Sequence, residues 1–165
     1  TLAKKIYNHT KVKDHFSCRA WVSISKEYRR KEILQVIIKN ISSLTNEELE
    51  TLDRMTTDEL ERKVQELLEG TRYLVVLDDI WSKNAWDSLN MALPDTKNKS
   101  RVMLTTRNED VALHADGQTR PHYLQNLNKD ESWELFRRKV FTENNHSSYP
   151  SFLEKLGRAI VDRCG

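Results

Sequence analysis

The most informative part of the sequence is the stretch Tyr73-Leu74-Val75-Val76-Leu77-Asp78-Asp79-Ile80-Trp81. Five consecutive apolar residues are followed at once by two carboxylates. A short unbroken apolar run between polar residues indicates a strand that is buried on both faces, as in a parallel sheet. Parallel sheets bind ligands in the crevice at the carboxyl ends of their strands. We therefore expect Asp78 and Asp79 to lie beside a ligand.

Two adjacent carboxylates at this position suit a hydrated magnesium ion on a nucleotide phosphate. Mg²⁺ takes oxygen ligands and keeps several of its waters, so Asp78 would hold the ion through water. Asp79 would orient or deprotonate an attacking water. Successive strand residues point to opposite faces, which is why we expect different tasks for the two acids. A purely structural interpretation stays open, in which the strand ends in acids because the chain returns to solvent.

The composition is that of an ordinary globular domain and excludes several classes of function. The 165 residues carry a net charge of +2, which gives no support for nucleic-acid or membrane binding. No apolar run approaches the about 20 residues of a transmembrane helix, and no signal peptide is evident. Two distant cysteines, Cys18 and Cys164, favour a reducing compartment, which we take to be the cytoplasm.

The number and spacing of the glycines and histidines argue against two further kinds of site, a phosphate-cradling loop and a histidine-based metal or catalytic site. The four glycines stand singly, far below the average share of about 7%, whereas a phosphate-cradling loop needs clustered glycines. The five histidines show no ligand spacing, so neither a zinc site nor a Ser/His/Asp triad is supported.

Apolar spacing and capping patterns predict alternating helices and strands. We expect helices at 1–8, 31–44, 56–70, 84–93 and 109–115, strands at 17–24, 73–77, 100–107 and 122–124, and a polar connection at 45–55. This alternation favours an α/β fold with a mainly parallel sheet and right-handed crossovers. After Leu127 only helices are expected, so we place a subdomain boundary there and divide the chain into 1–126 and 127–165.

Arg107 is the expected partner of the two acids. It ends the predicted strand 100–107, whose polarity matches that of strand 73–77, so its guanidinium should reach the same crevice. Arginine forks onto phosphate oxygens and could report whether a terminal phosphate is present. The alternatives are a salt bridge to Asp78 or Asp79 and a strand end that faces water.

Four stretches, residues 16–25, 74–81, 100–107 and 123–136 with Phe141, form a linked set of motifs. They resemble, in the same order, motifs of the NB-ARC domain in plant NLR disease-resistance proteins. Trp81 at the end of the second motif is typical of the coiled-coil (non-TIR) class. Residues 16–25 resemble the RNBS-A motif, residues 74–81 kinase 2 (Walker B), residues 100–107 kinase 3 or RNBS-B, and residues 123–136 with Phe141 RNBS-C and the start of the first ARC subdomain.

This resemblance implies a P-loop NTPase-type, three-layer fold and an ADP/ATP switch with weak ATPase activity. ADP would hold the resting state, and ATP would accompany activation, homo-oligomerisation and hypersensitive cell death in plant innate immunity. Carried over by motif, Asp78 would hold Mg²⁺ and Asp79 would be the base for hydrolysis. Arg107 would sense the γ-phosphate. Thr1, in Thr1-Leu2-Ala3, resembles the last Thr of Gly-Lys-Thr-Thr-Leu-Ala and would lie near the α-phosphate.

The departures from the family pattern are as informative as the matches. The P-loop glycines, its Lys and its Mg²⁺-binding Thr are absent, and Cys164-Gly165 resembles the residues before the GLPL motif. The resemblance thus implies a fragment that lacks the first strand and the P-loop, with the coiled coil and the leucine-rich repeats as partner domains. We expect this chain alone to bind ATP poorly, to be inactive, and to be marginally stable because strand edges are unpaired.

Two other functions stay open. A degenerate NB-ARC module could act only as a protein-interaction scaffold, with Trp133 and Phe136 on an exposed helix face, although packing against the sheet is the plainer interpretation of these rings. A related ATPase with unrelated biology is the third interpretation. The RNBS-A stretch and Trp81 argue against it, since hydrolysis requires neither.

Overall fold

The computed structural model describes residues 2–95, 97–140 and 151–164, and the chain divides into two compact units, Thr1–Pro121 and His122–Gly165. Thr1 and Phe141 lie outside the described residues. The functional division into 1–126 and 127–165 stays a prediction.

In chain order the first unit contains α1 (Leu2–Asn8), α2 (Thr10–His15), β1 (Cys18–Ser23), α3 (Arg30–Ile41), α4 (Asn46–Arg54), α5 (Thr57–Leu68), β2 (Tyr73–Asp78), α6 (Lys83–Asn90), β3 (Arg101–Leu104) and α7 (Glu109–Ala115). The second unit contains α8 (Lys129–Val140) and α9 (Ser151–Cys164).

The first unit is built on a parallel sheet of three strands in the order β1-β2-β3. Ala20 of β1 pairs with Val75 of β2, and Leu77 of β2 pairs with Leu104 of β3. Because all three strands run in the same direction, their carboxyl ends meet at one edge of the sheet. The parallel sheet with flanking helices confirms the predicted α/β class.

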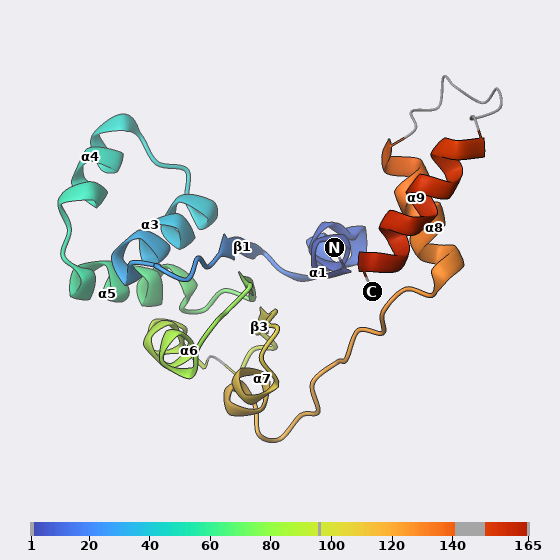
Figure 1. Ribbon diagram of the computed structural model, residues 1–165. Helices are drawn as coiled ribbons and strands as arrows, with labels where there is room; N and C mark the ends of the chain where they lie inside the picture. Colours follow the sequence, from blue (N-terminus) through green and yellow to red (C-terminus); the bar gives the residue numbers. More distant parts are fainter. Residues whose placement is uncertain (1, 96, 141–150, 165) are drawn as a thin grey trace. The chain divides into compact units, whose positions relative to one another are not determined.

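One face of the sheet forms the core with helices from the same unit. Figure 1 shows α3 and α5 together on one side of the sheet and α1 on the other. The sheet and helices α3, α4, α5, α6 and α7 contribute a single apolar cluster, and no polar or charged side chain of the described residues is fully buried. The main buried members are Ala20, Val22, Leu34, Ile37, Ile38, Leu60, Val64, Leu68, Val75, Leu77, Leu89 and Val111.

The opposite face is covered at β1 by α1. The ring of Tyr7 meets that of Trp21 edge-on, with the centroids 5.4 Å apart. The guanidinium of Arg19 lies over Tyr7 and donates a hydrogen bond of 2.8 Å to its carbonyl oxygen. On this face β2 presents Leu74 and Val76, which are also buried. The unbroken apolar run of β2 is therefore buried on both faces, as the sequence predicts.

Residues 45–55, predicted to be a polar connection, instead contain helix α4. The Thr45 hydroxyl accepts from the backbone N–H of Glu48, and the Glu48 carboxylate accepts from the backbone N–H of Thr45. This reciprocal cap starts the helix, and Leu52 anchors it with 3% exposure. The prediction failed because a single buried side chain gives no visible periodicity. The hydrogen bond from the Thr45 backbone also lowers the pKa of Glu48.

Two predicted strands also differ in the structure. The strand expected at 100–107 covers only Arg101–Leu104, and its last three residues are half-buried, since β3 lies at one edge of the described sheet. The strand expected at 122–124 is absent from the described residues. There Tyr123 and Leu124 are exposed by 61% and 68%, so no burial offsets the loss of conformational entropy that strand formation entails.

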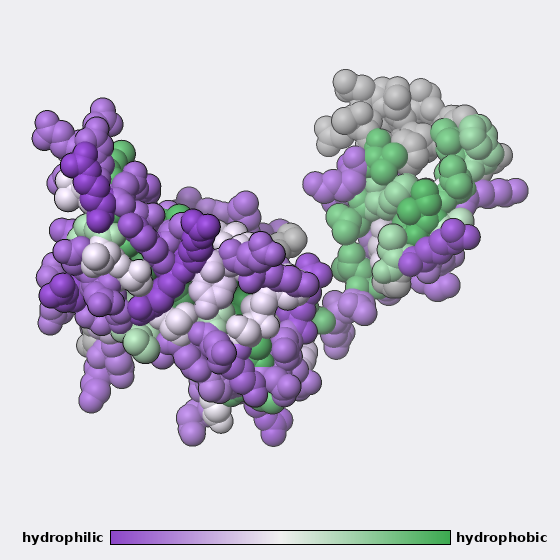
Figure 2. All heavy atoms as spheres, turned by 60° about the vertical axis from the view of Figure 1, so that its left-hand side comes forward, coloured by the Kyte–Doolittle hydropathy of each residue, from purple (hydrophilic) through white to green (hydrophobic). Residues whose placement is uncertain are grey.

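The second unit is a pair of helices in which two aromatic rings of α8 pack against a glycine of α9. Trp133 and Phe136 of α8 are stacked, with centroids 5.8 Å apart. A Cβ at Gly157 of α9 would lie within 2.9 Å of both rings, so only glycine permits this approach. The two rings thus pack on α9. Figure 2 shows apolar side chains on the surface of this unit. Leu135 of α8 and Phe152 of α9 are exposed by 50% and 64%.

Candidate functional site

Asp78 is the last residue of β2 and is held in place by both neighbouring strands. Its backbone oxygen accepts from the backbone N–H of Ile24, which follows β1, at 2.8 Å. Its carboxylate oxygen Oδ1 accepts from the hydroxyl of Thr105, which follows β3, at 2.7 Å. The side chain is half-buried. One carboxylate oxygen is therefore oriented by a hydroxyl group that also comes from the carboxyl edge of the sheet.

Asp79 leaves the strand through a left-handed backbone conformation with φ of 62°. Aspartate tolerates this region better than most residues, because its short polar side chain can hydrogen-bond locally. The backbone N–H of Asp79 donates to the hydroxyl oxygen of Thr105 at 2.8 Å. Its side chain is 40% exposed and faces Arg107 rather than Thr105. The two adjacent carboxylates consequently have different neighbours.

Arg107 lies three residues beyond the end of β3, not at the end of the strand as predicted. Its Nε is 3.6 Å from Oδ1 of Asp79, and its side chain is 82% exposed. The salt bridge that the sequence left open is thus the contact present in the structure. An exposed ion pair of this kind is worth about 0–1 kcal/mol. Such a pair leaves the guanidinium free to exchange the carboxylate for a competing anion.

Thr105 and Thr106 tie the segment after β2 to the segment after β3. The backbone oxygen of Thr105 accepts from the backbone N–H of Ile80 at 2.9 Å, and the hydroxyl of Thr106 donates to the oxygen of Ile80 at 2.7 Å. Sequence reasoning assigned no role to either threonine. The strand register explains the position of Thr105, which is the next residue after the Leu77–Leu104 pair and therefore lies across from Asp78. The sequence alone does not give this register.

The donor set at this edge fits a hard cation that keeps part of its hydration shell. Carboxylate oxygens are the ligands that Mg²⁺ prefers, and it commonly binds proteins through one or two of them. Among residues 2–95, 97–140 and 151–164, no group of three or more His, Cys, Asp or Glu side chains is arranged to bind a metal ion. Asp78 and Asp79 could therefore hold such an ion only together with water or ligand oxygens. The role of Thr1 lies outside the described residues.

A depression of about 350 Å³ lies at the opposite, amino-terminal end of β2 and β3. It is bordered by Tyr73 and Arg101, the first residues of the two strands, and by the loop that precedes β3. None of the predicted site residues lines it. Hydrogen bonding and charge point instead to the carboxyl edge, where ligands of parallel sheets bind.

Comparison with known proteins gives one family and a consistent set of relatives. The sequence model of the NB-ARC domain matches residues 1–146. The chain is 44% identical over 163 residues to the disease resistance protein RPP13 of Arabidopsis thaliana, covering 99% of this chain and 19% of that protein. It is 38% identical over 170 residues to the ToMV resistance protein Tm-2(2) of Solanum lycopersicum, covering 100% of this chain and 19% of that protein. The chain thus spans about a fifth of the length of these relatives.

Proposed function

Since this chain belongs to the NB-ARC family, we propose that it carries the metal- and phosphate-sensing part of an ADP/ATP-dependent switch in plant defence. The family is a nucleotide-binding one, and the relatives are plant disease resistance proteins. The observation that carries the proposal is the meeting of Asp78, Asp79 and Arg107 at the carboxyl ends of two adjacent parallel strands.

Each side chain has a role that its surroundings support. Asp78, oriented by the Thr105 hydroxyl, would hold Mg²⁺ through water, and the ion would neutralise negative charge on the phosphates. Asp79 would orient or deprotonate the attacking water during slow hydrolysis. The half-exposed Asp79 carboxylate suits this task better than Asp78, whose Oδ1 already accepts a hydrogen bond. Thr1 would contribute near the α-phosphate.

The contact between Arg107 and Asp79 provides a way to distinguish two nucleotides. With ADP bound, Arg107 would keep its carboxylate partner at 3.6 Å. With ATP bound, the γ-phosphate would compete for the guanidinium, because charge-assisted bonds to phosphate are among the stronger hydrogen bonds. Release of Arg107 would also free Asp79 for its role as base. The difference in charge between ADP and ATP would thereby become a local rearrangement at the edge of the sheet.

The consequences for a whole protein follow from this switch. ADP would mark the resting state, and ATP would permit homo-oligomerisation and hypersensitive cell death, with a coiled coil and leucine-rich repeats as partner domains. The two cysteines are free thiols, which supports a reducing compartment such as the cytoplasm. No helix in the described part of the chain has the length and apolarity needed to span a membrane.

A scaffold that acts only through protein contacts is the second candidate. It is favoured by the apolar side chains on the α8–α9 pair, where Leu135, Phe152 and Leu156 are exposed by 50% to 64%. A scaffold needs no nucleotide, so the two candidates differ in a direct measurement.

The test compares nucleotide binding by the full-length gene product that contains these residues. The nucleotide that co-purifies is identified after denaturation, and ADP and ATP affinities are measured by calorimetry. Arg107→Gln should weaken ATP binding about 10- to 100-fold, which corresponds to the loss of a hydrogen bond between charged groups, and should change ADP binding little. Arg101→Gln, an exposed arginine at the other end of β3, is the matched control. A wild-type protein that binds neither nucleotide would favour the scaffold.

A further inference from the structure

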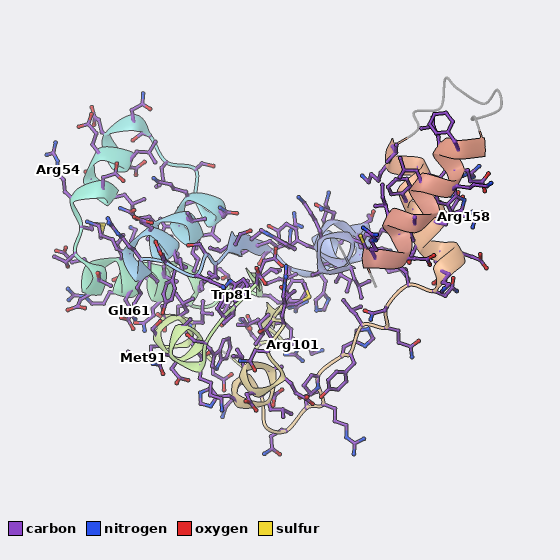
Figure 3. All side chains as sticks on the ribbon, viewed as in Figure 1. Arg54, Glu61, Trp81, Met91, Arg101 and Arg158 are labelled. Atoms are coloured by element: carbon purple, nitrogen blue, oxygen red, sulfur yellow. The ribbon has the colours of Figure 1, made fainter. Side chains whose placement is uncertain are left out.

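Trp81 lies in the loop between β2 and α6, outside the core cluster, and is 36% exposed. Figure 3 labels it beside the ends of the strands. The Nζ of Lys26 is 4.4 Å from the centroid of its ring, and the guanidinium carbon of Arg107 is 5.8 Å from it. Lys26 follows β1, Trp81 follows β2 and Arg107 follows β3. One indole ring thus gathers two cations from segments on either side of it.

The backbone on both sides of Trp81 is fixed, so the ring itself is well placed. Ile80 is 1% exposed and exchanges hydrogen bonds with the segment after β3. Ser82 caps α6, because its hydroxyl accepts from the backbone N–H of Ala85 at 3.2 Å. A ring held between a buried residue and a helix cap presents a defined face to its neighbours.

The indole ring supplies what Arg107 and Lys26 otherwise lack, namely a fixed surface. Arginine and lysine each carry about 2 kcal/mol of side-chain rotamer entropy, and both side chains are exposed. Cations within about 6 Å of a tryptophan centroid are attracted to the ring face. The attraction leaves the N–H groups at the periphery of the guanidinium available for an oxygen ligand. Trp81 can therefore limit the positions of both cations without neutralising them.

We infer that Trp81 is a positioning residue that holds Arg107 and Lys26 at the carboxyl edge of the sheet, and that Lys26 is a second phosphate-directed cation. The inference rests on the proposed function. Asp78 and Asp79 bring two negative charges to this edge, and Lys26 with Arg107 balances them. When the terminal phosphate of ATP takes Arg107 from Asp79, the ring keeps the guanidinium near the strand ends. The positive charge of Lys26 then attracts the terminal phosphate of ATP, which ADP lacks.

The test is a comparison of Trp81→Leu with Trp81→Phe in the full-length gene product. Leucine keeps an apolar side chain but has no ring to attract cations, whereas phenylalanine keeps the ring. Trp81→Leu should weaken ATP binding by up to about five- to thirtyfold relative to wild type, the size expected for two exposed cation–ring contacts. ADP affinity should change less than about twofold. Trp81→Phe should lie close to wild type, and thermal midpoints should agree for all three proteins, because Trp81 is outside the core.

A double-mutant cycle tests the part played by Lys26. Lys26→Gln should weaken ATP binding in the same direction. The loss in the double variant, Trp81→Leu with Lys26→Gln, should be smaller than the sum of the two single losses, since part of the effect of Trp81 is to position Lys26. Equal ATP affinities for the leucine and phenylalanine variants, or equal losses for ADP and ATP, would overturn the inference while leaving the switch intact. Absence of nucleotide binding in the wild type would overturn the proposed function, and the inference with it.

Discussion

The interior of the sheet and its carboxyl edge are built from the same strand but held together differently. Val75, Val76 and Leu77 of β2 are 0% exposed, whereas the side chain of Asp79, two residues further on, is 40% exposed. Burial stabilises the interior by roughly 25 cal/mol per Å² of apolar surface. The edge depends on a few hydrogen bonds that are made largely by the hydroxyl of Thr105 and the backbone around Ile80.

This difference predicts that stability and the proposed nucleotide sensing are separable. The interior has no buried polar group among the described residues, so it offers no chemistry, and its loss would unfold the unit. The carboxyl edge buries little apolar surface. Its charged side chains, Asp79 and Arg107, are exposed enough to exchange one ionic partner for another. Substitutions in the two regions should therefore alter different measurements, and the following predictions test that separation.

The largest effect is expected from Leu60→Ala in α5. Leu60 is 0% exposed in the core, and truncation of such a leucine typically destabilises a protein by about 2–5 kcal/mol. We expect a large fall in the thermal midpoint of the full-length gene product, with an unchanged ratio of ATP to ADP affinity in the protein that remains folded. Leu135→Ala, at an apolar residue exposed by 50%, should change the midpoint little. A changed affinity ratio in Leu60→Ala would break the separation.

An intermediate effect is expected from Thr105→Val. Valine has nearly the same shape but removes the hydroxyl that donates to Asp78 and accepts from the backbone N–H of Asp79. A part-buried N–H and a carboxylate oxygen lose their partner, at a cost of about 1–3 kcal/mol. Because the Asp78 carboxylate is no longer oriented, the Mg²⁺ dependence of ATP binding should weaken as well.

Thr105→Ser is the matched control, since it keeps the hydroxyl and loses only a methyl group. Titrations of ATP affinity against Mg²⁺ concentration, together with thermal midpoints, compare the two variants with wild type. If valine and serine behave alike in both measurements, the hydroxyl network does not orient the edge.

The sequence predicted the interior well and the edge in part, for physical reasons. The apolar run 73–77 predicts a strand buried on both faces without reference to any other part of the chain. Both β2 and the position of Asp78 at its end could therefore be predicted from the local sequence. The roles of Thr105 and Trp81 depend on register and on contacts between separate loops, which no local pattern contains. Helix α4 was missed because Leu52 is its only buried residue. The strand expected at 122–124 was wrong because a short apolar pattern does not specify a partner.

The smallest effect, and the sharpest division between backbone and side chain, is expected at Asp79. With φ of 62°, this residue suits asparagine and glycine better than alanine, for which the left-handed region costs roughly 1–2 kcal/mol. Asp79→Asn should therefore keep the thermal midpoint close to wild type, whereas Asp79→Ala should lower it by an amount that matches this strain. Both substitutions remove the ion pair with Arg107, which contributes little to stability because the arginine is 82% exposed.

ATP hydrolysis should fall equally in both variants if Asp79 is the base, while ATP binding persists because Arg107 is no longer shared with a carboxylate. A midpoint that falls equally for asparagine and alanine would mean that the carboxylate, and not the backbone conformation, stabilises this edge, and the two regions would then be less separable than their burial implies.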